Sequence, residues 1–214
     1  MGHPLAYPAL VTIGTLAITL AWVPFGDSEQ AAMLAAVAVI ILGYSGFRLA
    51  VGLGYLPAGV PAGGGVREVA VRRVRQQDRL VSRSWLEFTV GGKERWLPVY
   101  FDLPLVAVTQ GTAELSGRAV YVDGGRVYPA GRVRDSEPVG KLIDNPARPD
   151  PEALGRSGIG RRLLLDAQSA VVAPFAALLW VYVAGGGWTA FVAATLVAAA
   201  TATWLPAIRG SDPT

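Results

Sequence analysis

The stretch LAYPALVTIGTLAITLAWV, residues Leu5–Val23, contains no charged side chain and few polar ones. A helix that crosses the roughly 30 Å hydrocarbon core of a bilayer needs about 20 residues of this kind. Pro24 and a polar turn end the stretch. We therefore predict that it forms a transmembrane helix.

Three more stretches resemble the first, and together they make two close pairs. The apolar segments are 31–47, which continues past Arg48 to Leu56, then 163–183, which includes Asp166, and finally 189–208. Four buried helices of this kind are hard to accommodate in a soluble chain of 214 residues. We expect two transmembrane hairpins, residues 1–56 and 163–208.

The composition agrees with a membrane protein that carries one polar insert. Apolar residues make up 52% of the chain and charged residues 16%, against roughly 25% charged in soluble domains. Most charges lie between residues 66 and 166. The fold class we predict is α+β, with four transmembrane helices as two hairpins and an inserted small antiparallel β domain. Its parts are a linker at 57–65, the β domain at 66–135, an extended linker at 136–162 and a tail at 209–214.

The basic residues indicate how the chain is oriented. The turn at 24–30 has acidic residues but no basic one, the turn at 185–187 has no charge, and all 19 Lys and Arg residues lie on the opposite side of the spans. Short loops rich in Lys and Arg stay in the cytoplasm. We expect a multi-pass protein of the cell (inner) membrane, with both termini and the β domain cytoplasmic.

The insert alternates short β-branched runs with turn residues, which favours a small barrel or sandwich. Gly91-Gly92 and Asp123-Gly124-Gly125 are hairpin signals. A helix over 66–83 is an alternative, because Val66, Ala70 and Val74 recur every four residues. The expected strands are 66–75, 85–90, 96–101, 105–109, 118–122 and 126–128.

Six arginines occur in VREVAVRRVRQQDRLVSR, residues 66–83. Basic residues just beyond a span attract anionic lipid of the cytoplasmic leaflet. Nucleic acid is not expected, because the nearby Trp85 and Trp96 lie on expected core strands instead of interleaving with the arginines on an exposed face. The residues predicted to contact anionic lipid headgroups or a partner are Arg67, Arg72, Arg73 and Arg75.

Two features within the spans point to helix packing. Small residues recur every four positions, which allows helix backbones to approach closely, although the abundance of alanine could produce such rows by chance. Arg48 and Asp166 both fall near the inner boundary of the membrane, where they could pair or each reach water separately. The residues predicted for the packing or partner interface are Gly46, Ala50, Gly54, Ala190, Ala194, Ala198 and Ala202.

The sequence offers little for catalysis. There is no cysteine, and His3 is the only histidine, which excludes His-based triads and His-rich metal sites. Gly43-Tyr44-Ser45-Gly46 has the form of a membrane serine protease motif but lacks a membrane histidine as base. The carboxylates at 144, 150 and 152 stand among prolines, which is typical of turns. We expect no enzyme, no cofactor and no metal.

The chain resembles small actinobacterial membrane proteins of the LucA/LucB type, accessory subunits of Mce-family lipid importers. The resemblance rests on four sequence segments, RWLPVYFDLPL (95–105), VYVDGGRVYPAGRVR (120–134), NPARPDP (145–151) and WLPAIRGSDP (204–213). It implies a non-enzymatic subunit that supports a complex of permease and other transporter subunits importing fatty acids or sterols.

Two other functions remain open at this point. The chain could be a stand-alone lipid-handling or carrier protein, which would need polar residues around a cavity at the midplane. It could also be a membrane-tethered module that binds a cytoplasmic partner.

Overall fold

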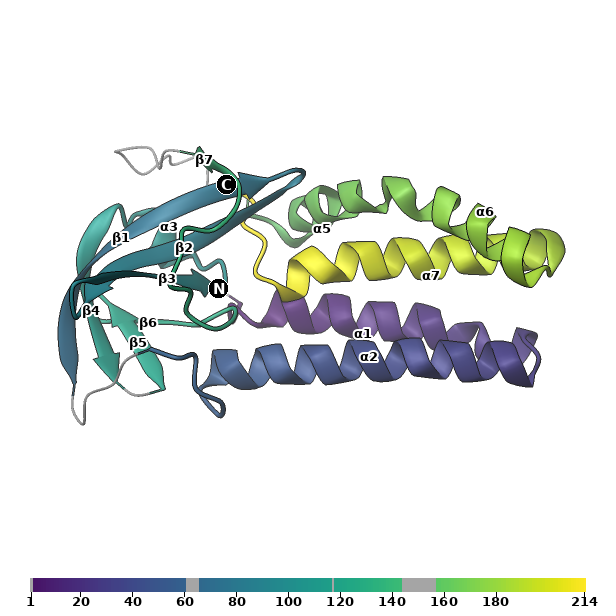
Figure 1. Cartoon of the computed structure of the whole chain (residues 1–214), viewed down its shortest axis with the longest axis horizontal. Coiled ribbons are helices and arrows are strands. Elements are labelled where there is room, and N and C mark those ends of the chain that lie inside the picture. Colours follow the sequence, from purple (N-terminus) through teal and green to yellow (C-terminus); the bar gives the residue numbers. More distant parts are fainter. Residues whose placement is uncertain (1, 61–65, 117, 144–156) are drawn as a thin grey trace.

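The computed structural model of the chain describes residues 2–60, 66–116, 118–143 and 157–214. A bundle of long helices carries a β domain at one end, and both termini lie near the junction of the two parts (Figure 1). The helical elements are α1 (Ala6–Ala21), η1 (Val23–Phe25), α2 (Ser28–Leu53), α3 (Leu103–Val106), α5 (Ile159–Ala167), η2 (Gln168–Val172), α6 (Ala173–Ala184) and α7 (Gly187–Ile208). The strands are β1 (Arg67–Asp78), β2 (Val81–Val90), β3 (Lys93–Val99), β4 (Gln110–Ser116), β5 (Ala119–Val122), β6 (Gly125–Val127) and β7 (Lys141–Ile143).

Four helical segments are long and apolar enough to cross a membrane, as the sequence predicted. They are Ala6–Phe25, Ser28–Leu53, Ile159–Ala184 and Gly187–Ile208. α2 begins at a capped end, where the Asp27 side chain accepts a hydrogen bond from the Gln30 backbone N–H at 2.8 Å. The third segment is interrupted by η2 just before α6, and Pro174 lies in the first turn of α6, where the N–H that proline lacks is not needed.

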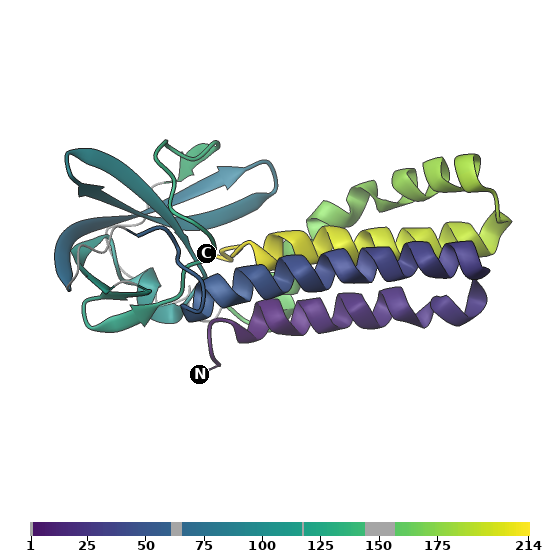
Figure 2. The same ribbon diagram turned by 60° about the horizontal axis from the view of Figure 1, so that its bottom comes forward.

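α1, α2 and α7 share one hydrophobic core, and α6 lies at the edge of the bundle. α1 packs against both α2 and α7, and α7 packs against α6. Figure 2 shows α6 standing apart from α1 and α2. In α6 the buried residues are Ala173 and Ala177, while Phe175, Leu178 and Tyr182 are exposed. The bundle therefore turns large apolar side chains outward, as a membrane helix does toward lipid.

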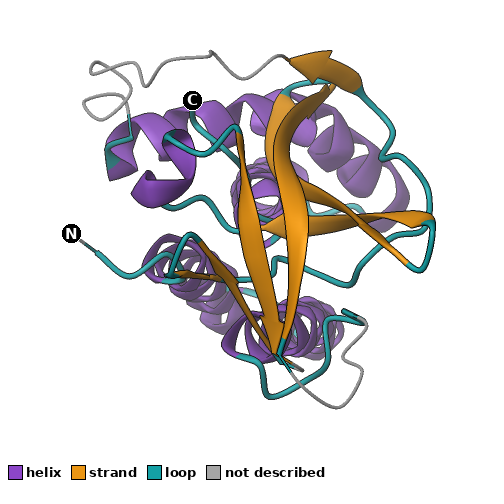
Figure 3. Ribbon diagram, turned by 90° about the vertical axis from the view of Figure 1, so that its left-hand side faces the viewer, coloured by secondary structure: helices purple, strands orange, loops and turns teal. Residues whose placement is uncertain are grey.

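The β domain is a single antiparallel sheet in the order β3-β2-β1-β4-β5-β6, with β7 paired to the end of β1. The long β1 pairs with β4 through its first half and with β2 through its second half, and Figure 3 shows the curvature that follows. This pairing rules out the helical alternative for residues 66–83. Val71, for example, stands opposite both Phe88 and Gly111.

Both predicted hairpin turns are confirmed. Gly91 and Gly92 have φ angles of 61° and 73°, and Asp123 and Gly124 have φ angles of 48° and 79°. Two successive residues of positive φ make the type I′ turn that suits the twist of paired strands. The turns join β2 to β3 and β5 to β6.

The segment after β6 closes the sheet. The backbone N–H of Ala130 donates to the Pro98 carbonyl, and that of Arg134 donates to the Trp96 carbonyl, both at 2.8 Å. The chain that leaves β6 thus lies against β3, at the other end of the strand order. The insert is a small closed barrel, one of the two forms that the sequence favoured.

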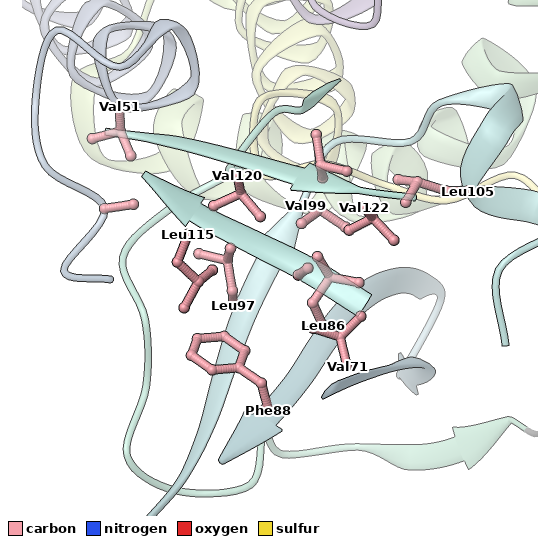
Figure 4. Packing of buried hydrophobic residues seen from close by; sticks show 13 residues of the cluster. Val51, Val71, Leu86, Phe88, Leu97, Val99, Leu105, Leu115, Val120 and Val122 are labelled. Atoms are coloured by element: carbon pink, nitrogen blue, oxygen red, sulfur yellow. The ribbon is translucent and has the colours of Figure 1, made fainter. Parts of the chain in front are cut away.

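The barrel core includes a residue from the membrane helices. Figure 4 shows Val51, near the end of α2, among the side chains of the β domain. The neighbouring Gly52 allows the approach, because a Cβ there would lie 3.2 Å from both the Pro129 carbonyl oxygen and the Tyr100 ring. The buried core residues are Val51, Ala58, Val71, Leu86, Phe88, Leu97, Val99, Leu105, Ala113, Leu115, Val120, Val122 and Val127.

One predicted strand is wrong. Residues 105–109 do not form a strand, because the chain turns into the short helix α3. The Asp102 side chain caps this helix by accepting from the Leu103 N–H at 2.8 Å, and Pro104 fits its first turn. The first half of β1 pairs instead with β4, a strand that the sequence analysis did not identify.

Candidate functional site

The residues that follow α7 bind to the β domain and join it to the helices. The Asp212 backbone N–H donates to the Ser82 carbonyl at 2.9 Å, and Ser211 bridges to Arg83 on β2. The Tyr100 hydroxyl donates to the Ile208 carbonyl at 2.9 Å. The segment 209–214, expected only as a cytoplasmic tail, is therefore a structural part of the junction.

A buried ion pair lies at the centre of this junction. Arg73 of β1 contacts the Asp212 carboxylate at 2.8 Å, and their side chains are 1% and 0% exposed. The Arg73 guanidinium also donates to the Ser84 hydroxyl and to the Leu105 carbonyl. The Ser84 hydroxyl in turn donates to Asp212 at 2.5 Å. Burial alone would raise the pKa of Asp212, but Arg73 and the bonds from Ser84 and Thr214 outweigh it, so the pKa lies below its usual range.

A second polar cluster ties α1, α5 and the same terminal segment together. The Asp166 carboxylate accepts hydrogen bonds from the Tyr7 hydroxyl at 2.6 Å and from the Ser211 hydroxyl at 2.9 Å. The Arg162 guanidinium lies 4.0 Å from the centre of the Tyr7 ring and 5.3 Å from that of Phe101. Asp166 is buried, and its carboxylate therefore serves to hold helices and tail together.

The ion pair suggested for Arg48 and Asp166 is absent from the contacts of the described residues. Arg48 instead donates to the Arg209 carbonyl at 3.4 Å, and its guanidinium lies 5.6 Å from the centre of the Tyr44 ring. The acceptor for Arg48 and one of the two hydrogen-bond donors to Asp166, the Ser211 hydroxyl, are supplied by residues after α7. These residues come from a part of the chain that looked like a polar tail.

The four arginines expected to contact lipid or a partner do not act as a group. Arg73 is buried in the ion pair with Asp212, so its expected lipid contact is wrong. Arg75 is half-buried and donates to the Thr214 hydroxyl at 2.8 Å. Arg72 is exposed and pairs with Glu87 on the neighbouring strand at 2.6 Å. Arg67 is exposed at the start of β1.

Three other arginines do gather at the membrane end of the β domain. Arg48 comes from α2, Arg83 from β2, and Arg209 follows α7 directly. The Arg209 Nε donates to the Tyr44 hydroxyl at 3.0 Å, and its guanidinium lies 5.8 Å from the centre of that ring. Burial, together with the positive charges of Arg209 and Arg48, lowers the pKa of Arg83 to about 10.

Polar side chains within the spans bond to one another. Ser45 of α2 accepts from the Trp204 indole N–H of α7 at 2.9 Å and lies 3.3 Å from the Thr12 hydroxyl of α1. The Thr15 hydroxyl reaches the Ala200 carbonyl at 3.2 Å. Ser45 thus belongs to helix packing, as expected for a G-x-S-G sequence without a catalytic partner. The polar groups that a midplane carrier site would need are engaged in these contacts.

The small residues predicted for helix packing do not share one environment, and only some of them lie between helices. Gly46 is exposed, with nothing within 4 Å of a Cβ placed on it. Gly54 ends α2 with a φ of 86°, and a Cβ there would lie 2.8 Å from the Arg118 carbonyl oxygen, so it serves the turn into the β domain. Ala50 is half-buried, and so are the α7 residues Ala190, Ala194, Ala198 and Ala202. α7 lies between α1 and α6, where a small side chain permits close packing.

Nothing in the described part of the chain resembles a metal centre, since no group of three His, Asp or Glu residues could hold an ion there. His3 is exposed, and its Nδ1 accepts a hydrogen bond from the Leu5 backbone N–H at 3.2 Å. The carboxylates at 144, 150 and 152 lie outside the described residues. None of the protein-family models, curated proteins or solved structures with which the chain was compared matches it.

Proposed function

We propose that this chain is a non-enzymatic accessory subunit that stabilises or assembles a larger membrane complex. Its two pairs of spans form hairpins in the cell membrane, and its β domain and both termini face the cytoplasm. The one-sided distribution of basic residues described above supports this orientation, because all of them fall on one side of the expected spans. A reporter joined to residue 214 through a flexible linker tests it, and activity confined to the periplasm would refute it.

The observation that carries the proposal is the uncovered face of α2. Gly43 and Gly46 are exposed there, and a Cβ on either would meet nothing within 4 Å. Val39, Ile40 and Phe47 are exposed beside them. Lipid offers no hydrophobic gain for helix association, so helices associate where small residues let backbones approach closely. A helix of another subunit is the partner that such a face suits.

The interior contacts support the same function. Tyr7 and Ser211 both bond to Asp166, and Thr12 and Trp204 both bond to Ser45. The described polar groups of the spans are thus used for cohesion. A subunit that acts through its shape needs a rigid connection between its membrane part and its cytoplasmic part, and these contacts supply one.

The resemblance to LucA/LucB-type proteins makes an Mce-family lipid importer the first complex to test. A tagged copy, purified from native membranes in mild detergent, is expected to carry other transporter subunits with it. A tagged chain that migrates alone would refute the proposal.

Variants locate the contact. Gly46→Leu fills the uncovered face of α2 and is expected to abolish co-purification while leaving the fold intact. Gly14→Leu is the matched control, because Gly14 is likewise exposed on α1 with nothing within 4 Å of a Cβ. Equal behaviour of the two variants would show that the α2 face is not the contact.

A further inference from the structure

Arg48, Arg83 and Arg209, named here the arginine cluster, meet where the helices join the β domain. They come from three elements that are distant in the sequence and converge on Tyr44 and on the segment after α7. Both the Arg48 and the Arg209 guanidinium lie within 6 Å of the Tyr44 ring centre, at 5.6 Å and 5.8 Å. Arg83 is held beside them because its backbone bridges to Ser211.

The charge of the cluster is only partly balanced within the described part of the chain, since Asp78 and Asp166 act on Arg83 without forming an ion pair with it. The ion pairs there join Arg72 to Glu87, Arg73 to Asp212 and Arg95 to Asp135, and none includes a cluster arginine. Burial and the two neighbouring arginines lower the pKa of Arg83 to about 10, and Asp78 opposes this lowering only weakly. Three half-buried cations that repel one another are unfavourable without an opposite charge.

The hydrogen-bonding capacity of the cluster is also only partly used. The Nε atoms of Arg48 and Arg83 are buried and have no hydrogen-bond partner among the described residues. Arg48 donates to the Arg209 carbonyl, and Arg209 donates to the Tyr44 hydroxyl. A planar guanidinium has five donors in a fork that matches the oxygens of a phosphate, often two at a time. The three guanidinium groups, each only half-buried, are therefore suited to an oxyanion.

The position of the cluster indicates where the oxyanion comes from. Arg48 stands a little more than one turn before the end of α2 at Leu53, and Arg209 directly follows α7 at Ile208. Both residues thus lie where candidate spans end, which is the level of lipid headgroups. Tyr44 provides an aromatic ring beside the charges, as is common at a membrane interface.

We propose that the arginine cluster binds a phosphate group, that of an anionic phospholipid headgroup. The site does not depend on the subunit role proposed above. It also differs from the lipid contact predicted from the sequence, which placed Arg67 and Arg73 at the membrane. Arg73 is buried in an ion pair, and Arg67 lies six residues earlier, about 20 Å along an extended strand. β1 and β2 run from the end of the domain remote from the helices to a hairpin tip that points toward α5 (Figure 1).

The test uses the full chain, delipidated in a neutral detergent and then titrated with phosphatidylglycerol, phosphatidylcholine or inorganic phosphate. The readouts are the shift in Tm and the number of lipids retained in native mass spectrometry. We expect phosphatidylglycerol to raise Tm more than phosphatidylcholine and to be retained as a bound lipid. If inorganic phosphate gives the same shift, the phosphate site stands but is filled from solution. Equal effects of the two lipids, with no response to phosphate, would overturn the proposal.

Arg83→Gln removes one donor group and is expected to weaken phosphatidylglycerol binding roughly tenfold or more, which is the effect of losing a charged hydrogen bond. Arg83→Lys keeps the charge and should restore part of the affinity. Arg67→Gln, at an exposed arginine of the same domain, is the control and should bind as the wild type does. Identical binding by the Arg83→Gln and Arg67→Gln variants would overturn the site.

The lipid-free variant provides an independent check. Because Arg83 is repelled by its neighbours, Arg83→Gln should not lower Tm before lipid is added. A marked loss of Tm at this stage would show that the chain itself compensates the charge of Arg83, and it would refute the proposal. Arg48→Gln repeats the binding measurement from α2, so the result does not depend on one variant.

Discussion

Asp212→Ala is expected to destabilise the β domain strongly. The carboxylate lies 2.8 Å from the Arg73 guanidinium, and neither side chain is more than 1% exposed. Removing it leaves the guanidinium buried with two neutral acceptors, the Ser84 hydroxyl and the Leu105 carbonyl. Breaking a buried pair in this way costs about 3–5 kcal/mol, mainly because the remaining charge is uncompensated.

The surface of the same strand supplies a control. Arg72 is adjacent to Arg73 and pairs with Glu87 at 2.6 Å, but the two side chains are 54% and 18% exposed. An exposed pair contributes about 0–1 kcal/mol. Glu87→Ala is therefore expected to cost several-fold less than Asp212→Ala, although the two ion pairs have similar lengths.

Denaturant unfolding of the full chain in detergent measures the difference. Trp85 and Trp96 are buried in the β domain, so tryptophan fluorescence contains a signal from its unfolding. The double variant Arg73→Met with Asp212→Ala removes the orphaned charge and should lose less than the sum of the two single losses, by about 0.5–3 kcal/mol. The reasoning is refuted if Asp212→Ala costs no more than Glu87→Ala, or if the single losses add up.

Three further outcomes are expected. Lowering the pH should destabilise the fold from about pH 3.9 downward, which is the pKa of Asp in an unfolded chain. The pKa of Asp212 is lower in the folded chain, so its contribution to stability is complete above the unfolded pKa and is lost as the carboxylate protonates. Asp212→Asn should remove this part of the pH profile. Gly54→Ala should cost about 1–2 kcal/mol, since its φ is 86°, whereas Gly46→Ala, in open helix, should gain up to about 1 kcal/mol in thermal unfolding. Tyr7→Phe removes a 2.6 Å donor to a buried carboxylate and should cost about 1.5–3 kcal/mol in the same assay.

The spans and hairpin turns were predictable because each depends on neighbouring residues. An uninterrupted apolar segment such as Leu5–Val23 marks a membrane helix wherever it occurs, and Gly91-Gly92 allows the positive φ angles that a two-residue turn needs. The expected strand at 105–109 failed for a reason that is also local. Asp102 caps a helix and Pro104 fits its first turn, and these signals outweigh the β-branched residues that follow.

The junction was not predictable in the same way, because its pairs are far apart in the chain. Arg73 and Asp212 are 139 residues apart, and Ser211 to Thr214 read as an ordinary polar segment. One local signal was present. Val69, Val71 and Arg73 alternate on β1, so the arginine continues the register of the partly buried Val69 and the buried Val71. An arginine at an inward position requires a buried partner, and that requirement could have directed attention to a carboxylate elsewhere.

The attachment of the segment after α7 has a consequence for the order in which the chain is made. The ribosome releases Asp212 only after α6 and α7 have been synthesised, and until then the guanidinium of Arg73 lacks its ion-pair partner among the described residues. The barrel also needs Val51 from α2, which is made before any strand. The domain is therefore completed by residues that precede and follow it in the chain, and it can close only after α7 has been made. A chain that stalls before the final span would keep an incomplete domain, recognisable to the proteases that remove unfinished membrane proteins.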